Sequence, residues 1–271
     1  MLTAPHHTTI TLTRFVSVVL LSVANVSCGK VTESPVALRS AKPLVEVPSG
    51  NSISGRVVLI GGTPSDLAKV IDVGGNPLCS QHGAIVDPKW KVSRDGGFAD
   101  VVVSVRNGSM ASNVSPAEVL MDQKDCLFVP NLLSVQVGQS VRFRNSDMTF
   151  HNVRVVKHQL GSELQGKSVE NFAQASMGGE NSRVFYEPGI YRVECDVHRW
   201  MRGWIAVVEG IHFAVSDTEG NFQISRVLPD GKYVLEAWHA QFPEPLVQTV
   251  QVKGGVASAH FEFKLETAFR S

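Results

Sequence analysis

The hydrophobic and polar residues of this chain alternate in short runs from residue 53 to residue 263, a pattern of β-strands rather than helices. In Val141–Arg144, for example, Val141 and Phe143 fall on one face and the two arginines on the other. Most runs end at glycine, proline or asparagine, which are typical of turns. We therefore expect an all-β fold. The predicted strands are Ile53–Ile60, Ala99–Val105, Leu133–Val137, Val141–Arg144, Ser182–Tyr186, Tyr191–Cys195, Gly203–Val208, Phe213–Val215, Phe222–Ile224, Tyr233–Ala237, Val247–Val252 and His260–Phe263.

One stretch lacks this alternation. Residues 156–180 are polar and rich in glycine. We expect them to form a long excursion between strands, with at most a short helix.

The N-terminus has the pattern of an export signal. Arg14 precedes an apolar stretch, residues 15–26, that is too short to span a bilayer. Two cleavage sites remain open: the small residues Ser22 and Ala24 suit a signal peptidase, whereas residues 26–28 resemble a lipoprotein box that would leave Cys28 acylated. We expect residues 1–28 to be the signal and residues 29–50, which are rich in proline, to be a flexible linker. The protein would then be periplasmic, or anchored to the outer membrane or cell envelope through a lipid on Cys28.

Chain length and charge limit the number of domains and the kind of partner. The chain has 271 residues, enough for one large or two small domains. Lysine plus arginine and aspartate plus glutamate both number 25, so the formal net charge is zero. A nucleic-acid partner would favour a basic field, and nothing in this composition indicates one.

A short segment in the second half of the chain, residues 195–201, carries the most informative chemistry. Cys195, His198 and Met201 are each separated by two residues, so one loop can bring all three to a single metal ion. His151 would join them from a neighbouring loop. A thiolate, two imidazoles and a weak axial thioether are the ligand set of a blue-copper electron-transfer site.

The two passages that hold these residues, residues 137–153 and residues 191–201, resemble the cupredoxins, and among them proteins of the amicyanin and plastocyanin kind. The resemblance covers roughly residues 126–209. The whole chain also resembles bacterial plastocyanin-like proteins associated with methylamine utilisation, a label that fixes no substrate. The resemblance implies a Greek-key β-sandwich that binds one type 1 copper ion through His151, Cys195, His198 and Met201.

The resemblance also implies roles for neighbouring residues. Asn152 would hydrogen-bond across the two ligand loops, and His198 would be the edge ligand that faces solvent. Trp200 would lie beside the electron exit, with Arg199 and Arg202 around it, an arrangement that suits a partner with an acidic rim. This sequence has Arg199 where the amicyanin loop has proline, which puts the rigidity of the loop and the choice of partner in doubt.

Two of the four cysteines remain to be assigned. Cys28 belongs to the signal and Cys195 to the metal site, which leaves Cys79 and Cys126 as a disulfide pair in an exported protein. The alternative is a second metal site, because Cys79 and His82 also have metal-ligand spacing.

The C-terminal strands, in residues 210–266, resemble the carboxypeptidase-regulatory-like (transthyretin-like) β-sandwich. The first strand of that sandwich resembles residues 55–57 followed by residues 62–64, far upstream. Residues 51–110 are then part of the second sandwich, with the cupredoxin domain, residues 111–209, inserted into it. Two consecutive β-domains are the simpler alternative.

We expect an electron carrier and no enzyme, with a redox protein such as a cytochrome c or a dehydrogenase as partner. The chain lacks the His-x-His pairs of a multicopper oxidase, and structural zinc gains nothing from methionine. His239 is interpreted as a packing or surface residue. Two other functions stay open: a module that stores or delivers copper, and a cell-surface binding protein in which the cupredoxin fold is only structural.

Overall fold

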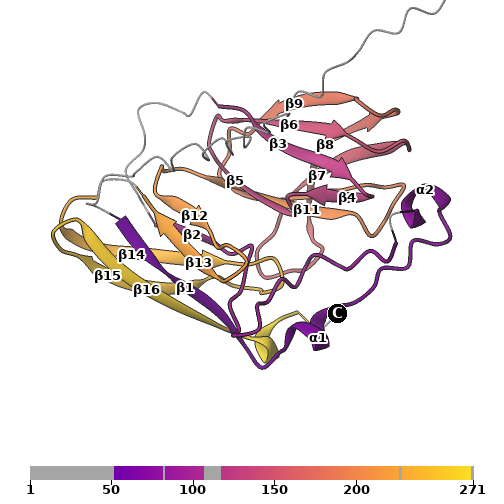
Figure 1. Ribbon diagram of the computed structural model, residues 1–271. Coiled ribbons are helices and arrows are strands. Elements are labelled where there is room, and N and C mark those ends of the chain that lie inside the picture. The colour runs from indigo at the N-terminus through magenta and orange to yellow at the C-terminus, as the bar shows by residue number, and fades with distance from the viewer. Residues whose placement is uncertain (1–51, 82, 107–116, 226–227, 270–271) are drawn as a thin grey trace, which may run out of the picture. The chain divides into compact units, whose positions relative to one another are not determined.

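The computed structural model describes residues 52–81, 83–106, 117–225 and 228–269. The predicted signal, the linker, Cys28 and His82 lie outside this part. The described residues form sixteen strands, two four-residue helices and a 3-10 turn (Figure 1). Within them, no helix is both long and apolar enough to cross a membrane. The predicted all-β class is therefore confirmed.

The middle of the chain forms a first sandwich of two sheets. One sheet has the strand order β5-β11-β10-β7-β8, and the other has the order β4-β3-β6-β9. The first sandwich comprises β3 (Val119–Lys124), β4 (Leu127–Val129), β5 (Leu132–Gln136), β6 (Ser140–Asn145), β7 (His151–His158), β8 (Gly166–Gln174), β9 (Glu180–Val184), β10 (Gly189–Glu194) and β11 (Arg202–Val208).

Alternation along the strands builds the core of the first sandwich. In β6, Val141 and Phe143 are fully buried, whereas the alternating Arg142 and Arg144 are half-buried. They pack with Met121, Val153, Val193 and other apolar residues of both sheets. Burying these side chains stabilises the fold by about 1.5–3 kcal/mol for each large one.

A second sandwich combines strands from the two ends of the described chain. One sheet has the order β13-β1-β16, and the other has the order β12-β2-β14-β15. The second sandwich comprises β1 (Ser52–Ile60), β2 (Val102–Val105), β12 (Phe213–Val215), β13 (Asn221–Ile224), β14 (Gly231–Trp238), β15 (Leu246–Val252) and β16 (Val256–Lys264). The helices α1 (Pro64–Leu67) and α2 (Pro77–Ser80) lie between β1 and β2 in sequence, and η1 (Leu265–Thr267) follows β16.

The register of β1 shows that the second sandwich is discontinuous in sequence. β1 pairs in parallel with β16 over its whole length, from Ser52 opposite Val256 to Ile60 opposite Lys264. Gly55 is required within this pairing, because a Cβ there would lie 1.8 Å from the carbonyl oxygen of Ala259. β1 and β16 thus lie side by side in one sheet, although the strands of the first sandwich come between them in sequence.

Two tryptophans contribute to the contact between the sandwiches. The rings of Trp204 in β11 and Trp238 in β14 lie 5.5 Å apart, edge to face. They belong to a small buried cluster that also holds Val102, Leu132 and Ala206. Edge-to-face aromatic pairs add about 0.5–1.5 kcal/mol to the energy of burial.

The expectation of a long excursion over residues 156–180 is wrong. β7 continues to His158, β8 occupies Gly166–Gln174, and β9 begins at Glu180. β8 lies at the edge of its sheet and is mostly exposed. An edge strand that faces solvent needs no apolar alternation, which is why the pattern did not reveal it.

Candidate metal centre

The strand order of the first sandwich brings the predicted ligands to one end of a sheet. His151 is the first residue of β7, and Cys195 directly follows β10. β7 and β10 are antiparallel neighbours, with Arg154 opposite Glu194, so His151 and Cys195 lie at the same end. His198 and Met201 lie on the loop from β10 to β11.

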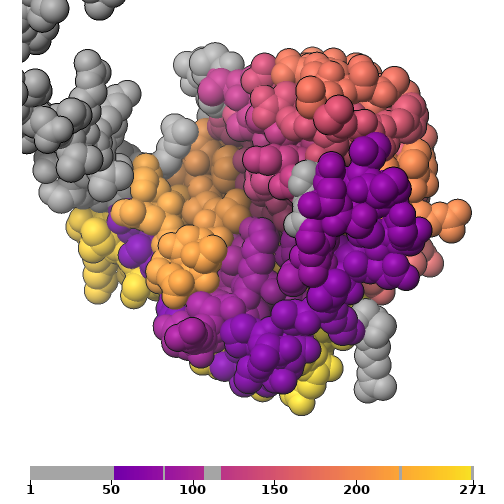
Figure 2. Space-filling model, turned by 45° about the vertical axis from the view of Figure 1, so that its right-hand side comes forward, coloured from indigo at the N-terminus to yellow at the C-terminus, as the bar shows by residue number. Residues whose placement is uncertain are grey.

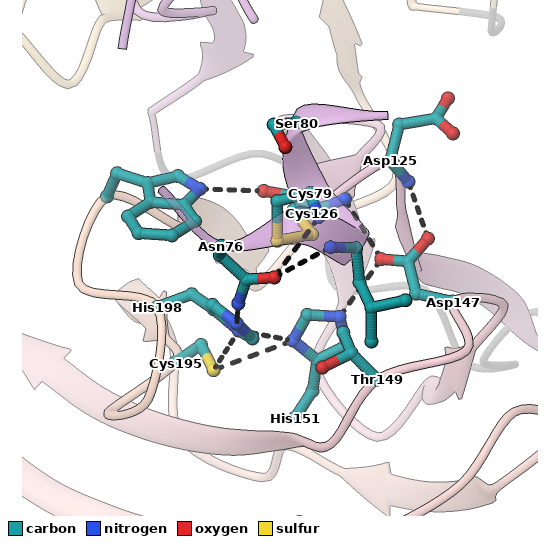
Figure 3. The surroundings of a disulfide bond; sticks show 12 residues. Asn76, Cys79, Ser80, Asp125, Cys126, Asp147, Thr149, His151, Cys195 and His198 are labelled. Atoms are coloured by element: carbon teal, nitrogen blue, oxygen red, sulfur yellow. Dashed lines mark hydrogen bonds and ion pairs between the residues drawn. A yellow bond between two sulfur atoms is a disulfide. The ribbon is translucent and has the colours of Figure 1, made fainter. Parts of the chain in front are cut away.

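Three ligand atoms converge at this end. Cys195 Sγ lies 3.8 Å from Nδ1 of His151 and 3.8 Å from Nδ1 of His198, and the two Nδ1 atoms are 2.9 Å apart (Figure 3). A point equidistant from the three atoms lies about 2.1 Å from each, and bonds from a first-row metal to nitrogen and sulfur measure about 2.0–2.3 Å. The three side chains are buried. Their donor set and spacing therefore fit one copper ion.

Asp147 orients His151. The Nε2 atom of His151 lies 2.9 Å from Oδ2 of Asp147. Burial by itself lowers the pKa of His151, but the hydrogen bond with Asp147 and the neighbouring Cys195 sulfur raise it overall above its ordinary value. With a proton on Nε2 shared with the carboxylate, Nδ1 presents its lone pair to the metal position.

Cys195 is the free cysteine of the described chain and is buried. Burial raises the pKa of its thiol. Hydrogen bonds with His151 and His198, together with the backbone N–H groups of Asn152 and His198, outweigh that effect and lower the pKa to about 6. The site thus favours the thiolate, which is the form that binds metal.

His198 does not face solvent, so the expectation of an exposed edge ligand is wrong. Its side chain is only 2% exposed. Asn76, from the segment before the first sandwich, covers it, with Nδ2 lying 3.0 Å from Nε2 of His198. The ring of Trp200 lies 5.1 Å from the imidazole on the same loop.

Met201 is fully buried in the core of the first sandwich. Its backbone N–H donates to the carbonyl of His198 at 2.8 Å, and its own carbonyl accepts from Cys195 N–H at 3.3 Å. These two backbone hydrogen bonds close the loop from Cys195 to Met201. Met201 is therefore held beside Cys195 and His198 by main-chain contacts.

Asn152 connects the two ligand loops. Its Oδ1 accepts the backbone N–H of Asp196 at 2.6 Å, and its Nδ2 donates to Oδ2 of Asp196 at 2.9 Å. The same Nδ2 also donates to Oδ1 of Asn171 at 3.0 Å. The residue after His151 thus binds the residue after Cys195, the arrangement that the family resemblance implied.

Cys79 and Cys126 form a disulfide, and both are buried (Figure 3). Cys79 therefore has no thiol to offer a second metal site. The sulfur of Cys126 lies near Asp147 and His151, but that sulfur too is used by the disulfide.

The sequence reasoning missed two residues of the site. Asp147 stands four residues before His151, and this short spacing was a signal that could have been followed. Asn76 is 122 residues away from His198 and had no local signal. His239 was interpreted as a packing or surface residue and is a packing residue, whose ring contacts those of Phe98, Trp90 and Phe242.

Comparison with known proteins identifies a family that matches part of the chain. Residues 116–208 match the family model described as copper binding proteins of the plastocyanin/azurin family. They form a copper-binding domain of that family, whereas the remainder of the chain lies outside the match. No curated protein sequence matches the chain.

Three solved structures illustrate what the chain resembles. Amicyanin from Paracoccus versutus is 19% identical, with a TM-score of 0.29, and the match covers 39% of this chain and 97% of that one. A purple cupredoxin from Nitrosopumilus maritimus is 24% identical, with a TM-score of 0.28, over 34% of this chain and 99% of its own. A copper-containing nitrite reductase from Thermus scotoductus SA-01 is 24% identical, with a TM-score of 0.29, over 38% of this chain and only 25% of its own length.

Proposed function

We propose that this protein binds one type 1 copper ion and carries single electrons between redox partners. His151, Cys195 and His198 would hold the ion through two Nδ1 atoms and Sγ, with Met201 as the weak axial ligand. The observation that carries this proposal is the convergence of these three atoms in a buried pocket. Bound copper would supply the cycle between Cu(I) and Cu(II).

The residues around the site suit electron transfer because they hold the ligands still. Asp147 orients His151, Asn152 joins the two loops, and Met201 closes the second loop through its backbone. Fixed ligands need little rearrangement when the charge of the ion changes. Burial of all three ligands disfavours copper delivery, since a delivery protein must exchange its ligands with a partner.

The partner surface that we propose lies around Trp200, which is half-buried, and Arg199, which is exposed. Arg202 is paired with Glu194, with Nε and Oε1 3.7 Å apart, and so offers less free charge. A cytochrome c or a dehydrogenase with an acidic rim would suit this surface. The expected export signal supports a location in the periplasm or cell envelope, with Cys28 as the proposed lipid anchor.

The test is the absorption spectrum of the purified protein loaded with Cu(II). An intense band in the red visible region, absent from Cys195→Ala, is expected from a copper–thiolate bond. Redox cycling with a small reductant and oxidant should bleach and restore the band. A colourless protein, or equal copper binding by the variant, would contradict the proposal and leave a β-sandwich binding module.

A further inference from the structure

The residues just before the first sandwich cover the metal site at His198. In Figure 2 the indigo N-terminal segment lies against the magenta and orange surface of the first sandwich. Within this segment, Asn76 is the N-cap of α2, and the oxygen and the nitrogen of its side-chain amide have different partners. Its Oδ1 accepts the backbone N–H groups of Leu78 and Cys79, at 3.0 and 3.3 Å. This cap turns Nδ2 toward the imidazole of His198 (Figure 3).

The segment is fastened at several points. Cys79, three residues after Asn76, is joined to Cys126 by the disulfide. Cys79 and Ile85 are buried in the core of the first sandwich, and Ile71 packs against that core. The backbone of Ile71 also donates to the carbonyl of Ile85 at 2.8 Å, which ties the two ends of the segment together.

We propose that residues 70–81 and 83–86 contribute to a cover over His198, in which Asn76 is the positioning residue and the Cys79–Cys126 disulfide is the fastening. The cover explains why a histidine on a short loop is 2% exposed. Its existence does not depend on copper.

Its consequence for electron transfer rests on the proposed function. A partner cannot touch His198 while the cover is closed, so the electron must leave beside it. The ring of Trp200 is tilted against the imidazole at 5.1 Å, and its Nε1 donates to the carbonyl of Cys126, the disulfide partner of Cys79, at 3.1 Å. With His198 covered, the electron would leave the site through Trp200 and not through the edge of the His198 imidazole.

The cover is tested first on metal-free protein, by modification of histidine with diethyl pyrocarbonate and quantification of the labelled peptides by mass spectrometry. His260, which is exposed, serves as an internal standard. In the unaltered protein His198 should react much more slowly than His260. Asn76→Ala should speed the reaction at His198 by about tenfold and leave His260 unchanged, because opening of the cover becomes easier.

Two further variants complete this test. Asn221→Ala, at an exposed asparagine in β13, is the matched control and should leave both rates unchanged. The pair Cys79→Ala with Cys126→Ala removes the fastening and should speed the reaction at His198 as well. Equal rates at His198 and His260 in the unaltered protein, or no acceleration in either Asn76→Ala or the cysteine pair, would overturn the proposal.

A second measurement uses copper-loaded protein and separates this proposal from the proposed function. Removal of Cu(I) by bathocuproine disulfonate should be about tenfold faster in Asn76→Ala than in the unaltered protein. The position of the copper–thiolate band should also shift, since His198 would be held less firmly. Failure of the protein to bind copper would contradict the proposed function, whereas the labelling experiment would still decide whether the cover exists.

Discussion

Asp147 lies with Oδ2 at 2.9 Å from Nε2 of His151, and the same carboxylate accepts the backbone N–H groups of Asp125 and Cys126, at 2.7 and 2.9 Å. One side chain thus connects a proposed metal ligand with the turn that carries the disulfide. Burial raises the pKa of Asp147, but these hydrogen bonds outweigh it and hold the pKa below its ordinary value. Asp147 is therefore ionised when it orients the imidazole.

We predict that Asp147→Asn weakens copper binding by about 10–100-fold, the usual effect of losing a carboxylate behind a ligating histidine. The amide keeps one oxygen to accept a backbone N–H but removes the negative charge. A competition titration against a chelator of known affinity measures this. Glu219→Gln, at an exposed glutamate, is the control and should bind like the unaltered protein. Unchanged affinity in Asp147→Asn would show that His151 needs no carboxylate.

Asn152→Ala should lower the free energy of unfolding by about 1–3 kcal/mol, because the part-buried backbone N–H of Asp196 loses its acceptor. Urea unfolding of the metal-free protein measures the loss. Asn171→Ala is the comparison, since Asn171 contacts the same carboxylate, with Nδ2 3.3 Å from Oδ2 of Asp196, but accepts no backbone donor there. The prediction fails if the two variants are destabilised equally.

His239 should make the protein less stable in acid. Burial, followed by the charge of Lys91, lowers the pKa of His239 from its ordinary 6.5 to about 3. Below pH 6.5, His239 takes up a proton in the unfolded chain but stays neutral in the folded protein. The free energy of unfolding should then decrease with falling pH, by up to about 1.4 kcal/mol per pH unit, until the pH nears the folded pKa.

His239→Gln removes this contribution, so the stability difference between the unaltered protein and the variant should shrink steadily from pH 6.5 to pH 4. Urea unfolding at several pH values measures it. His158, whose pKa burial lowers to about 4, stays in both proteins and cancels in the comparison. A difference that stays constant over this range would argue against the assignment to His239.

Gly55→Ala should destabilise the second sandwich by several kcal/mol, since the new methyl group would clash with the carbonyl of Ala259 in the β1–β16 pairing. Gly231→Ala in β14 is the control, because the nearest neighbouring atom, a ring carbon of Tyr233, would be an ordinary 3.6 Å from the new Cβ. Thermal unfolding compares the two variants. If both unfold at the same temperature, the close pairing of β1 with β16 is not as the structure has it.

Features that rest on contacts between residues close together in the sequence could be predicted. Cys195, His198 and Met201 are neighbours on one loop, so their spacing alone suggested a metal site. The alternation in β6 likewise followed from contacts that repeat every second residue. Local patterns of this kind are visible in a single sequence.

Contacts between residues far apart in the sequence leave little signal in the sequence itself. The contact of Asn76 with His198 joins two turns that share no motif, so the cover was invisible and His198 was expected at the surface. The pairing of β1 with β16 could be suggested only through family resemblance, because neither strand indicates its partner. β8 was not predicted, because most of its residues are exposed to solvent and therefore need no alternation of apolar and polar side chains.

The parallel pairing of β1 with β16 also imposes an order on folding. β1 is made early, yet its partner strand is among the last described residues to be synthesised, so β1 must wait for almost the entire chain. The first sandwich is complete by Val208 and can form during this wait. Contacts so distant in sequence close slowly, and an unpaired strand edge meanwhile invites association with other chains. A protein cut short before β16 would consequently lose more than its final strand: β1 would keep only its pairing with β13, and the newly made chain would be prone to aggregate.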